Sequence, residues 1–239
     1  MPTAPCPLLL LPGLLCDHTV WQPQVNALHP DIECRVMNYE SAASLGAMAE
    51  RVLRDAPPRF AMAGHSMGGR VALEVLRRAP ERVDRAVLMD TGFRGLADGE
   101  AGAQEVAGRM RLVNLARDQG MRAMGQDWLH GMVHPERRRD TELCNTILDM
   151  IASKTPELFE RQIQALIERP DASDVLCHLH CPTTFMTGRQ DTWSNVEQHE
   201  AMAARVPGSH VIVIEDAGHM STLEQPEAVT QVLRDVMAA

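Results

Sequence analysis

The segment Gly64–Gly69, with the sequence Gly-His-Ser-Met-Gly-Gly, constrains the fold more than any other part of this 239-residue chain. It follows Phe60–Ala63, an apolar run typical of a buried strand, and precedes Val71–Leu76, whose apolar residues recur at helical spacing. A Gly-x-Ser-x-Gly element between a strand and a helix is typical of a nucleophile elbow, a turn so sharp that its serine adopts an unfavourable backbone conformation. We therefore predict that Ser66 projects from the edge of a sheet, at a helix N-terminus that favours negative charge. On the pattern alone, a flexible turn is the alternative.

Strand-like runs alternate with helical stretches over most of the chain. The expected strands are Pro7–Leu11, Glu33–Met37, Phe60–Ala63, Arg85–Met89, Thr183–Met186 and His210–Ile214. The helices expected between and after them are Trp21–Leu28, Leu45–Ala56, the stretch that includes Val71–Leu76, Val196–Arg205 and Pro226–Met237. This alternation predicts an α/β fold, in which a mostly parallel sheet is covered by helices on both faces.

The alternation is interrupted once, between residues 94 and 180, where no strand-like run is present. Amphipathic helices are expected there at Val106–Leu115, Met121–Leu129, Glu142–Ala152 and Pro156–Ile167. We predict a core formed by residues 1–93 and 181–239. Residues 94–180 would form a helical cap, inserted after the strand that ends at Met89 and placed above the strand ends.

Composition excludes several classes of partner. The net charge is −9 and the basic residues cluster only at Arg137–Arg139, which argues against a nucleic acid or an anionic membrane surface as partner. The leucines Leu8–Leu11 have no positive charge before them and are interrupted by Pro12, so we interpret them as a buried strand and not as a signal peptide. Six scattered cysteines without a secretory signal indicate reduced thiols and a cytoplasmic protein. The oligomeric state cannot be derived from the sequence.

Two further loops leave strand ends on the side of the sheet where Ser66 is expected. A serine hydroxyl is a weak nucleophile, so it needs a base within hydrogen-bond reach and a group that orients this base. The loop after the last strand carries His219, and the loop after Thr183–Met186 carries Asp191. Loops at the carboxyl ends of parallel strands converge on one crevice. The order Ser66, Asp191, His219 is the order expected for a catalytic triad on this architecture.

With these three motifs in this order, the chain resembles the serine hydrolases of α/β-hydrolase fold, of the small, capped, esterase or lactonase-like type. The resemblance covers residues 7–93 and 181–239. It implies that Ser66 is the nucleophile, His219 the general base and then acid, and Asp191 the group that orients the imidazole. It also implies an oxyanion hole formed by the backbone N–H groups of Met67 and Leu14, with Leu15 as the alternative second donor. Many relatives have His-Gly where this chain has Pro12-Gly13; a backbone donor does not depend on that histidine.

Several residues near these motifs have more than one interpretation. Asp90 ends the strand Arg85–Met89 and competes with Asp191 as the acid, although it is also a good turn residue. His65 adjoins the nucleophile, but adjacent side chains point in different directions, so we predict a packing role. Cys177–Cys181, with sulfur and imidazole groups close together, suggests a zinc site; we prefer a reduced loop, since adjacent residues cannot all face one ion. We expect no metal and no cofactor.

The cap is expected to determine specificity, and the candidate pocket residues are Leu15, Phe93, Trp128 and Trp193. We predict a serine hydrolase that cleaves a carboxylic ester, lactone or thioester of a small apolar molecule through an acyl-enzyme. Two alternatives remain open. The same triad serves carbon–carbon bond hydrolases and acyltransferases, and a ligand-binding or regulatory protein can use the same scaffold.

Overall fold

The computed structural model describes residues 6–39 and 41–239. Within them, six strands form one sheet: β1 (Leu8–Leu11), β2 (Cys34–Val36), β3 (Phe60–His65), β4 (Val83–Met89), β5 (Thr183–Gly188) and β6 (His210–Ile214). Their order in the sheet is β2-β1-β3-β4-β5-β6, and every neighbouring pair is parallel. The predicted α/β fold with a parallel sheet is confirmed.

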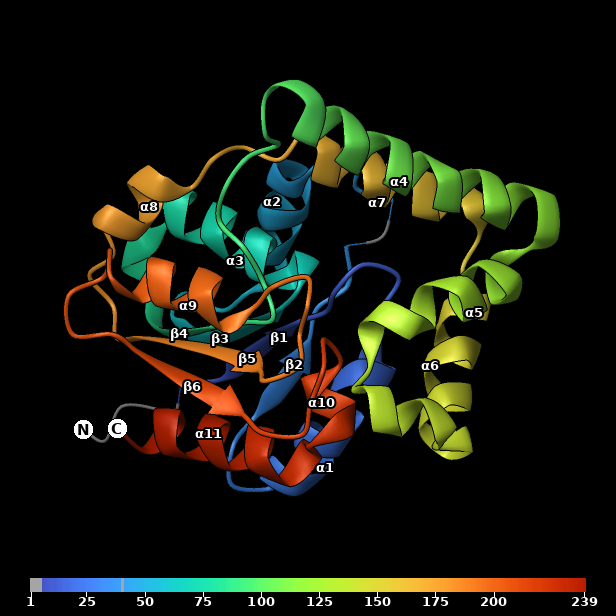
Figure 1. Cartoon of the computed structure of the whole chain (residues 1–239). Helices are drawn as coiled ribbons and strands as arrows, with labels where there is room; N and C mark the ends of the chain where they lie inside the picture. The colour runs from blue at the N-terminus through green and yellow to red at the C-terminus, as the bar shows by residue number, and fades with distance from the viewer. Residues whose placement is uncertain (1–5, 40) are drawn as a thin grey trace.

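Helices cover both faces of the sheet. They are α1 (Gln22–Leu28), α2 (Leu45–Asp55), α3 (Met67–Arg78), α4 (Gly99–Gln119), α5 (Met121–Met132), α6 (Thr141–Ala152), α7 (Pro156–Ile167), α8 (Ser173–Cys177), α9 (Val196–Ala203), α10 (Ser221–Glu224) and α11 (Pro226–Ala238). Short 3-10 helices occupy His18–Trp21, Pro80–Arg82 and Pro135–Arg139. Helices α2, α3, α8 and α9 lie on one side of the sheet, and α1, α10 and α11 lie on the other (Figure 1).

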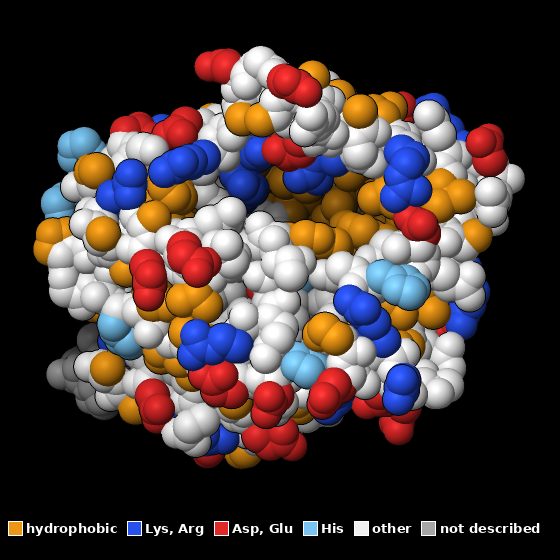
Figure 2. All heavy atoms as spheres, in the orientation of Figure 1, with side chains coloured by type: hydrophobic (Ala, Val, Ile, Leu, Met, Phe, Trp, Pro, Cys, Tyr) orange, Lys and Arg blue, Asp and Glu red, His pale blue; other side chains and the backbone are white. Residues whose placement is uncertain are grey.

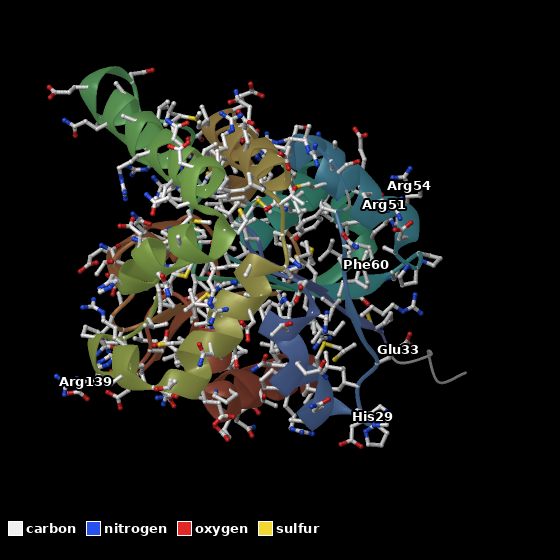
Figure 3. The ribbon with its side chains drawn as sticks, turned by 90° about the vertical axis from the view of Figure 1, so that its right-hand side faces the viewer. His29, Glu33, Arg51, Arg54, Phe60 and Arg139 are labelled. Atoms are coloured by element: carbon white, nitrogen blue, oxygen red, sulfur yellow. The ribbon has the colours of Figure 1, made fainter. Side chains whose placement is uncertain are left out.

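Burial on both faces explains why the central strands β1 and β3 consist almost entirely of apolar residues. All four leucines of β1 are at most 1% exposed, and every residue of β3 and β5 is buried. Polar residues lie on the outer faces of the helices: Arg51 and Arg54 project outward from α2, whereas Phe60 at the start of β3 lies inside (Figure 3).

Helix ends follow local capping chemistry where the sequence supplies it. The hydroxyl of Thr155 accepts a hydrogen bond from the Leu158 N–H at 3.2 Å, and Pro156 occupies the first turn of α7. Asp140 caps α6 in the same way, accepting from the Leu143 N–H at 3.1 Å. The predicted starts of these two helices were therefore correct to within one residue.

Two helices were missed and one was predicted too short. Helix α4 begins at Gly99 and not at Val106, because only three of its residues are buried and its first turns carry no apolar stripe. Helices α8 and α10 are only one turn or slightly longer, too short for a periodic pattern.

The helices between β4 and β5 do not all lie together. Helices α4 to α7 lie beyond the carboxyl ends of the strands (Figure 1). Helix α8 instead lies against α3 of the core, where Nη1 of Arg77 donates to Oδ2 of Asp174 at 2.7 Å. The predicted division at residues 93/94 and 180/181 stays a prediction, and the helices placed over the strand ends are α4 to α7.

The strand order changes direction between β1 and β3, because the chain passes from β1 to β2 on one side and then to β3 on the other. Such a reversal leaves a crevice at the carboxyl ends of the two strands, where open α/β sheets bind ligands. The loop after β1 and the turn after β3 both open into this crevice.

Candidate active site

Ser66 occupies the turn between β3 and α3 in a strained backbone conformation, with φ 54° and ψ −118°. The two glycines of the motif allow this turn. A Cβ atom at Gly64 would lie 2.5 Å from the carbonyl oxygen of Gly68, and one at Gly68 would lie 2.1 Å from the carbonyl oxygen of Leu11. Both clashes are with backbone atoms, which cannot move aside. The geometry is that of a nucleophile elbow, and the flexible-turn alternative is wrong.

The structure brings Ser66, His219 and Asp191 into one hydrogen-bonded chain. Oγ of Ser66 lies 2.8 Å from Nε2 of His219, and Nδ1 of the same ring lies 2.7 Å from Oδ2 of Asp191. The second carboxylate oxygen of Asp191 accepts from the N–H groups of Trp193 at 2.8 Å and Ser194 at 2.9 Å. These two hydrogen bonds from backbone amides hold the carboxylate in a single orientation toward the imidazole.

The charges in this chain favour a basic imidazole. Burial would lower the pKa of His219, but the charge and hydrogen bond of Asp191, together with smaller contributions from Asp90 and Glu224, hold that pKa above its ordinary value of 6.5. In the same way burial would raise the pKa of Asp191, yet His219 and the two amide donors lower it to about 2. Asp191 is therefore ionised at neutral pH. Nδ1 of His219 carries a proton and donates a hydrogen bond to the Asp191 carboxylate.

Asp90, the alternative acid, lies behind this chain and bonds elsewhere. Its Oδ1 accepts from the Gly188 N–H at 2.9 Å, and its Oδ2 accepts from the hydroxyl of Ser221. Complete burial and the nearby Asp191 charge raise the pKa of Asp90 to about 8. The structure thus brings Asp191, and not Asp90, to the imidazole of His219.

Two residues that line the cavity beside Ser66, Leu14 and Met67, have a backbone N–H with no acceptor among the described residues. The N–H of Met67 is the first of α3, where a helix offers no acceptor of its own. Residues 12–17, the loop after β1 that carries the predicted donor Leu14 and is called the oxyanion loop below, pass close to the elbow, since a Cβ atom at Gly13 would lie 3.1 Å from Cβ of Ser66. The amide of Leu15, the alternative second donor, is already bonded to Oε1 of Gln162 at 2.9 Å.

A cavity of about 810 Å³ opens above Ser66, between the strand ends and helices α4 to α7. Its mouth lies beneath α4, with hydrophobic side chains on its floor (Figure 2). Phe93, Trp128 and Trp193 line it, as predicted. Leu15 does not: it is 1% exposed and belongs to the hydrophobic core, and its backbone is in the left-handed conformation (φ 59°). The loop lines the cavity through Leu14 and Cys16 instead.

Trp193 connects the loop between β5 and α9, which carries Asp191, to helix α5. Its ring stacks on Trp128 of α5, with centroids 5.5 Å apart and planes inclined by 19°, and lies 5.0 Å from the ring of His219. A Cβ atom at Gly131 would lie 2.6 Å from the indole, so the approach of α5 depends on this glycine. The indole of Trp193 therefore contacts both helix α5 and the imidazole of His219.

The loop after β6 that carries His219, called the base loop below, is held by contacts that the sequence analysis missed. The N–H of His219 donates to the carbonyl of Met132 at 2.7 Å. Glu224 accepts from the N–H groups of Gly218 at 2.9 Å and Met220 at 3.2 Å. Neither partner could be identified from the sequence. Every residue has a backbone carbonyl, and no local pattern distinguishes Glu224 from the other glutamates.

The described part of the chain contains neither a candidate metal centre nor a candidate membrane span. Within residues 6–39 and 41–239, no three His, Cys, Asp or Glu side chains come together in a way that could hold a metal ion. Nδ1 of His178 bonds instead to the carbonyl oxygen of Asp174 at 2.7 Å. No helix in the described part of the chain has the length and apolar character needed to cross a membrane.

Comparison with known proteins agrees with this geometry. The profile of the alpha/beta hydrolase family matches residues 8–232. The solved structure of a thermophilic esterase from Thermogutta terrifontis, with malate bound, is 30% identical, has a TM-score of 0.84, and aligns over 96% of this chain and 88% of its own. The pimeloyl-[acyl-carrier protein] methyl ester esterase of Aliivibrio salmonicida (strain LFI1238) is 25% identical over 89% of this chain and 84% of its own length. The enol-lactonase of Burkholderia xenovorans LB400 is 20% identical with a TM-score of 0.86, over 100% of this chain and 94% of its own, which shows a shared fold.

Proposed function

Since this chain belongs to the alpha/beta hydrolase family, we propose that it is a serine hydrolase of carboxylic esters, with Ser66, His219 and Asp191 as its catalytic triad. The observation that supports this most directly is the hydrogen-bonded chain from Oγ of Ser66 through His219 to Asp191, at 2.8 and 2.7 Å. A binding protein has no need of a strained serine in contact with an oriented base.

In the proposed reaction, Oγ of Ser66 attacks the ester carbonyl carbon while its proton passes to Nε2 of His219. The negative charge that develops on the carbonyl oxygen accepts hydrogen bonds from the N–H groups of Leu14 and Met67. Collapse of this intermediate breaks the bond to the alcohol oxygen, which takes the proton from His219. Water then attacks the acyl-enzyme by the same steps, releasing the acid and restoring Ser66.

The substrate class is an ester, lactone or thioester small enough for a cavity of about 810 Å³. Relatives named as a methyl ester esterase and, at the level of the fold, an enol-lactonase agree with this class. We further propose that the protein acts in the cytoplasm, because its six cysteines are all free thiols.

Hydrolysis of a chain-length series of p-nitrophenyl esters by the wild type and by Ser66→Ala tests the proposal. Because Ser66 supplies the attacking oxygen, the variant should lose activity by about four to six powers of ten while its far-UV circular dichroism is unchanged. Equal rates for the two proteins would refute the assignment. Reaction in isotopic water, with and without an added alcohol, separates hydrolysis from acyl transfer, since only hydrolysis places solvent oxygen in the acid product.

A further inference from the structure

The cavity above Ser66 has an apolar side and a basic side. The apolar side is formed mainly by cap residues: Leu112, Trp128, Met132, Ile147, Met150, Ile151, Ile163 and Leu166. Among the described residues, the arginines that line the cavity are Arg70, Arg94, Arg109 and Arg169. Figure 2 shows Lys or Arg side chains along the edge of the hollow, above its hydrophobic floor. A purely apolar ester would use only the first of these two sides.

The acidic groups around the cavity do not balance these arginines. Glu105 is shared by two of them: it accepts from Nε of Arg109 at 2.9 Å and from Nη1 and Nη2 of Arg169 at 2.8 and 2.9 Å. Glu197 also lines the cavity, but within the described residues it forms no ion pair with any of the four arginines. Asp90 is buried, and that burial raises its pKa to about 8, so it is mostly uncharged at neutral pH. The basic side therefore keeps a net positive charge.

Two of these arginines, Arg94 and Arg70, form no ion pair with a described residue; Arg94 is exposed, with its guanidinium over the Phe93 ring, and the less exposed of the two is Arg70. Nη1 of Arg70 donates to the backbone carbonyl of Arg94 at 2.9 Å, and no carboxylate oxygen of a described residue lies within 4 Å of its guanidinium. A guanidinium has five N–H donors in a planar fork that matches a carboxylate. Burial, followed by the charges of Arg169 and Arg109, lowers the pKa of Arg70 to about 9. A bound anion would offset this uncompensated charge.

Arg70 lies near the proposed nucleophile Ser66, on the helix that begins just after it and beside the same cavity. It follows Ser66 by four residues, about one turn of α3, and side chains on a helix lean toward its N-terminus. The guanidinium therefore extends toward the cavity into which Ser66 opens, where it is among the lining residues. Its Nη2 lies over Gly92, since a Cβ atom at this glycine would be 2.9 Å from Nη2. One small molecule can thus reach both Ser66 and Arg70.

We propose that the substrate is an ester carrying a second, free carboxylate, which Arg70 binds while the apolar part of the molecule lies against the cap. This inference rests on the proposed function, because it places an ester carbonyl at Ser66. The carboxylate belongs either to the acid part or to the alcohol part of the ester, and the chemistry at Arg70 is the same in both cases.

Three matched series of esters test the proposal. The first contains monoethyl esters of straight-chain dicarboxylic acids, the second acetate esters of ω-hydroxycarboxylic acids, and the third neutral ethyl esters of equal chain length. The wild type should hydrolyse one of the anionic series with a kcat/KM about tenfold to a hundredfold above its neutral counterparts, mainly through KM. The preferred chain length would report the distance from Ser66 to Arg70.

The variant Arg70→Met, which keeps an apolar stem of similar length, should abolish this preference, so that it hydrolyses anionic and neutral esters of equal chain length with equal kcat/KM. Arg70→Lys keeps the charge but loses the fork, so it should retain part of the preference. Arg111→Met is the matched control, since it removes one exposed arginine, paired with Asp127, outside the cavity lining. Its preference for anionic esters should equal that of the wild type.

A wild type that hydrolyses neutral esters at least as well as both anionic series would overturn the carboxylate inference and leave the hydrolase assignment intact. The same holds if Arg70→Met keeps the full preference. Failure of the hydrolase assignment looks different: no ester of any series is cleaved, and a serine-directed phosphonate fails to label Ser66 in the folded protein. In that case both proposals are wrong.

Discussion

The ring of His65 donates from Nε2 to the backbone carbonyl of His219, at a distance of 2.7 Å. Burial, together with the adjacent His219, lowers the pKa of His65 to about 3, so the ring is neutral and its single proton is on Nε2. The residue before the proposed nucleophile thus holds the loop that carries the proposed base. We predicted a packing role for His65; it is indeed 1% exposed, and it also positions His219.

The variant His65→Phe tests this positioning role. Phenylalanine keeps the ring that packs edge-on against Trp21 but removes the donor, leaving the carbonyl of His219 unpaired. We expect kcat to fall by about tenfold to a hundredfold with little change in KM, because the base is displaced and the pocket is retained. His65→Gln, which offers an N–H near the Nε2 position, should recover part of kcat. A purely structural role would instead lower the melting temperature in both variants and leave kcat unchanged.

The pH dependence of the reaction should report the pair formed by His219 and Asp191. His219 must be neutral to accept the proton of Ser66, so kcat/KM should rise with pH through the pKa of this imidazole. Since the nearby acidic groups, Asp191 foremost, raise that pKa in spite of burial, the acidic limb should lie above pH 6.5 in the wild type. In Asp191→Asn the charge is lost, so the limb should move to lower pH and kcat should fall by about four powers of ten.

Asp90→Asn is the matched comparison for this variant. The raised pKa of Asp90, about 8, keeps it mostly protonated at pH 7, so an uncharged amide replaces an uncharged acid. We expect kcat at pH 7 to stay within about tenfold of the wild type, with the acidic limb still above pH 6.5. If Asp90→Asn proves as damaging as Asp191→Asn while its melting temperature is unchanged, Asp90 and not Asp191 supports the base.

The hydrogen bond from the Leu15 N–H to Oε1 of Gln162 should matter for catalysis, because it links helix α7 to the oxyanion loop. Gln162→Met removes the acceptor and leaves the Leu15 N–H buried and unpaired, so the neighbouring Leu14 amide loses its fixed direction. We expect a loss in kcat of about tenfold, smaller than the loss of a donor itself. Gln162→Glu keeps the oxygen and should perform better than Gln162→Met. Identical kcat values for wild type and Gln162→Met would show that the loop holds its shape without the cap.

Two glycine substitutions should change stability in opposite directions. In Gly68→Ala the new methyl group would meet the carbonyl of Leu11 at 2.1 Å, so we expect a loss of about 3 kcal/mol or more in the free energy of unfolding, together with loss of activity. At Gly108, inside α4, a Cβ atom meets nothing within 4 Å, so Gly108→Ala should stabilise the chain by about 0.5–1 kcal/mol. Urea denaturation of both variants measures the difference. A stable, active Gly68→Ala protein would contradict the tight elbow.

The strands and the three members of the hydrogen-bonded chain were accessible from sequence because each has a local signature. Ser66 lies between two glycines, and Asp191 and His219 follow buried strands in the expected order. The last strand, His210–Ile214, and the helix Pro156–Ile167 were predicted with their correct limits. Periodicity and turn chemistry act over a few residues, so they can be read without knowing the fold.

Hydrogen-bond partners could not be predicted in the same way. Gln162 is 147 residues from Leu15, and no local pattern relates the two. The length of α4 was missed because exposed helix turns carry no apolar stripe, and α10, which brings Glu224 to the base loop, is too short to show one. These elements are held by contacts with distant segments and not by their own sequence.

The amino-acid sequence was therefore sufficient for the parallel α/β core, the elbow at Ser66 and the short set of groups that can surround it. It left open which carboxylate reaches His219, which amide of the oxyanion loop stays unpaired, and which arginines face the cavity. Packing of the chain resolved these alternatives in favour of Asp191 and Leu14, and placed Arg70 without an acidic partner. The reason is one of scale: a hydrogen bond of about 3 Å depends on how whole helices and loops are positioned, and that follows from contacts between segments far apart in the chain.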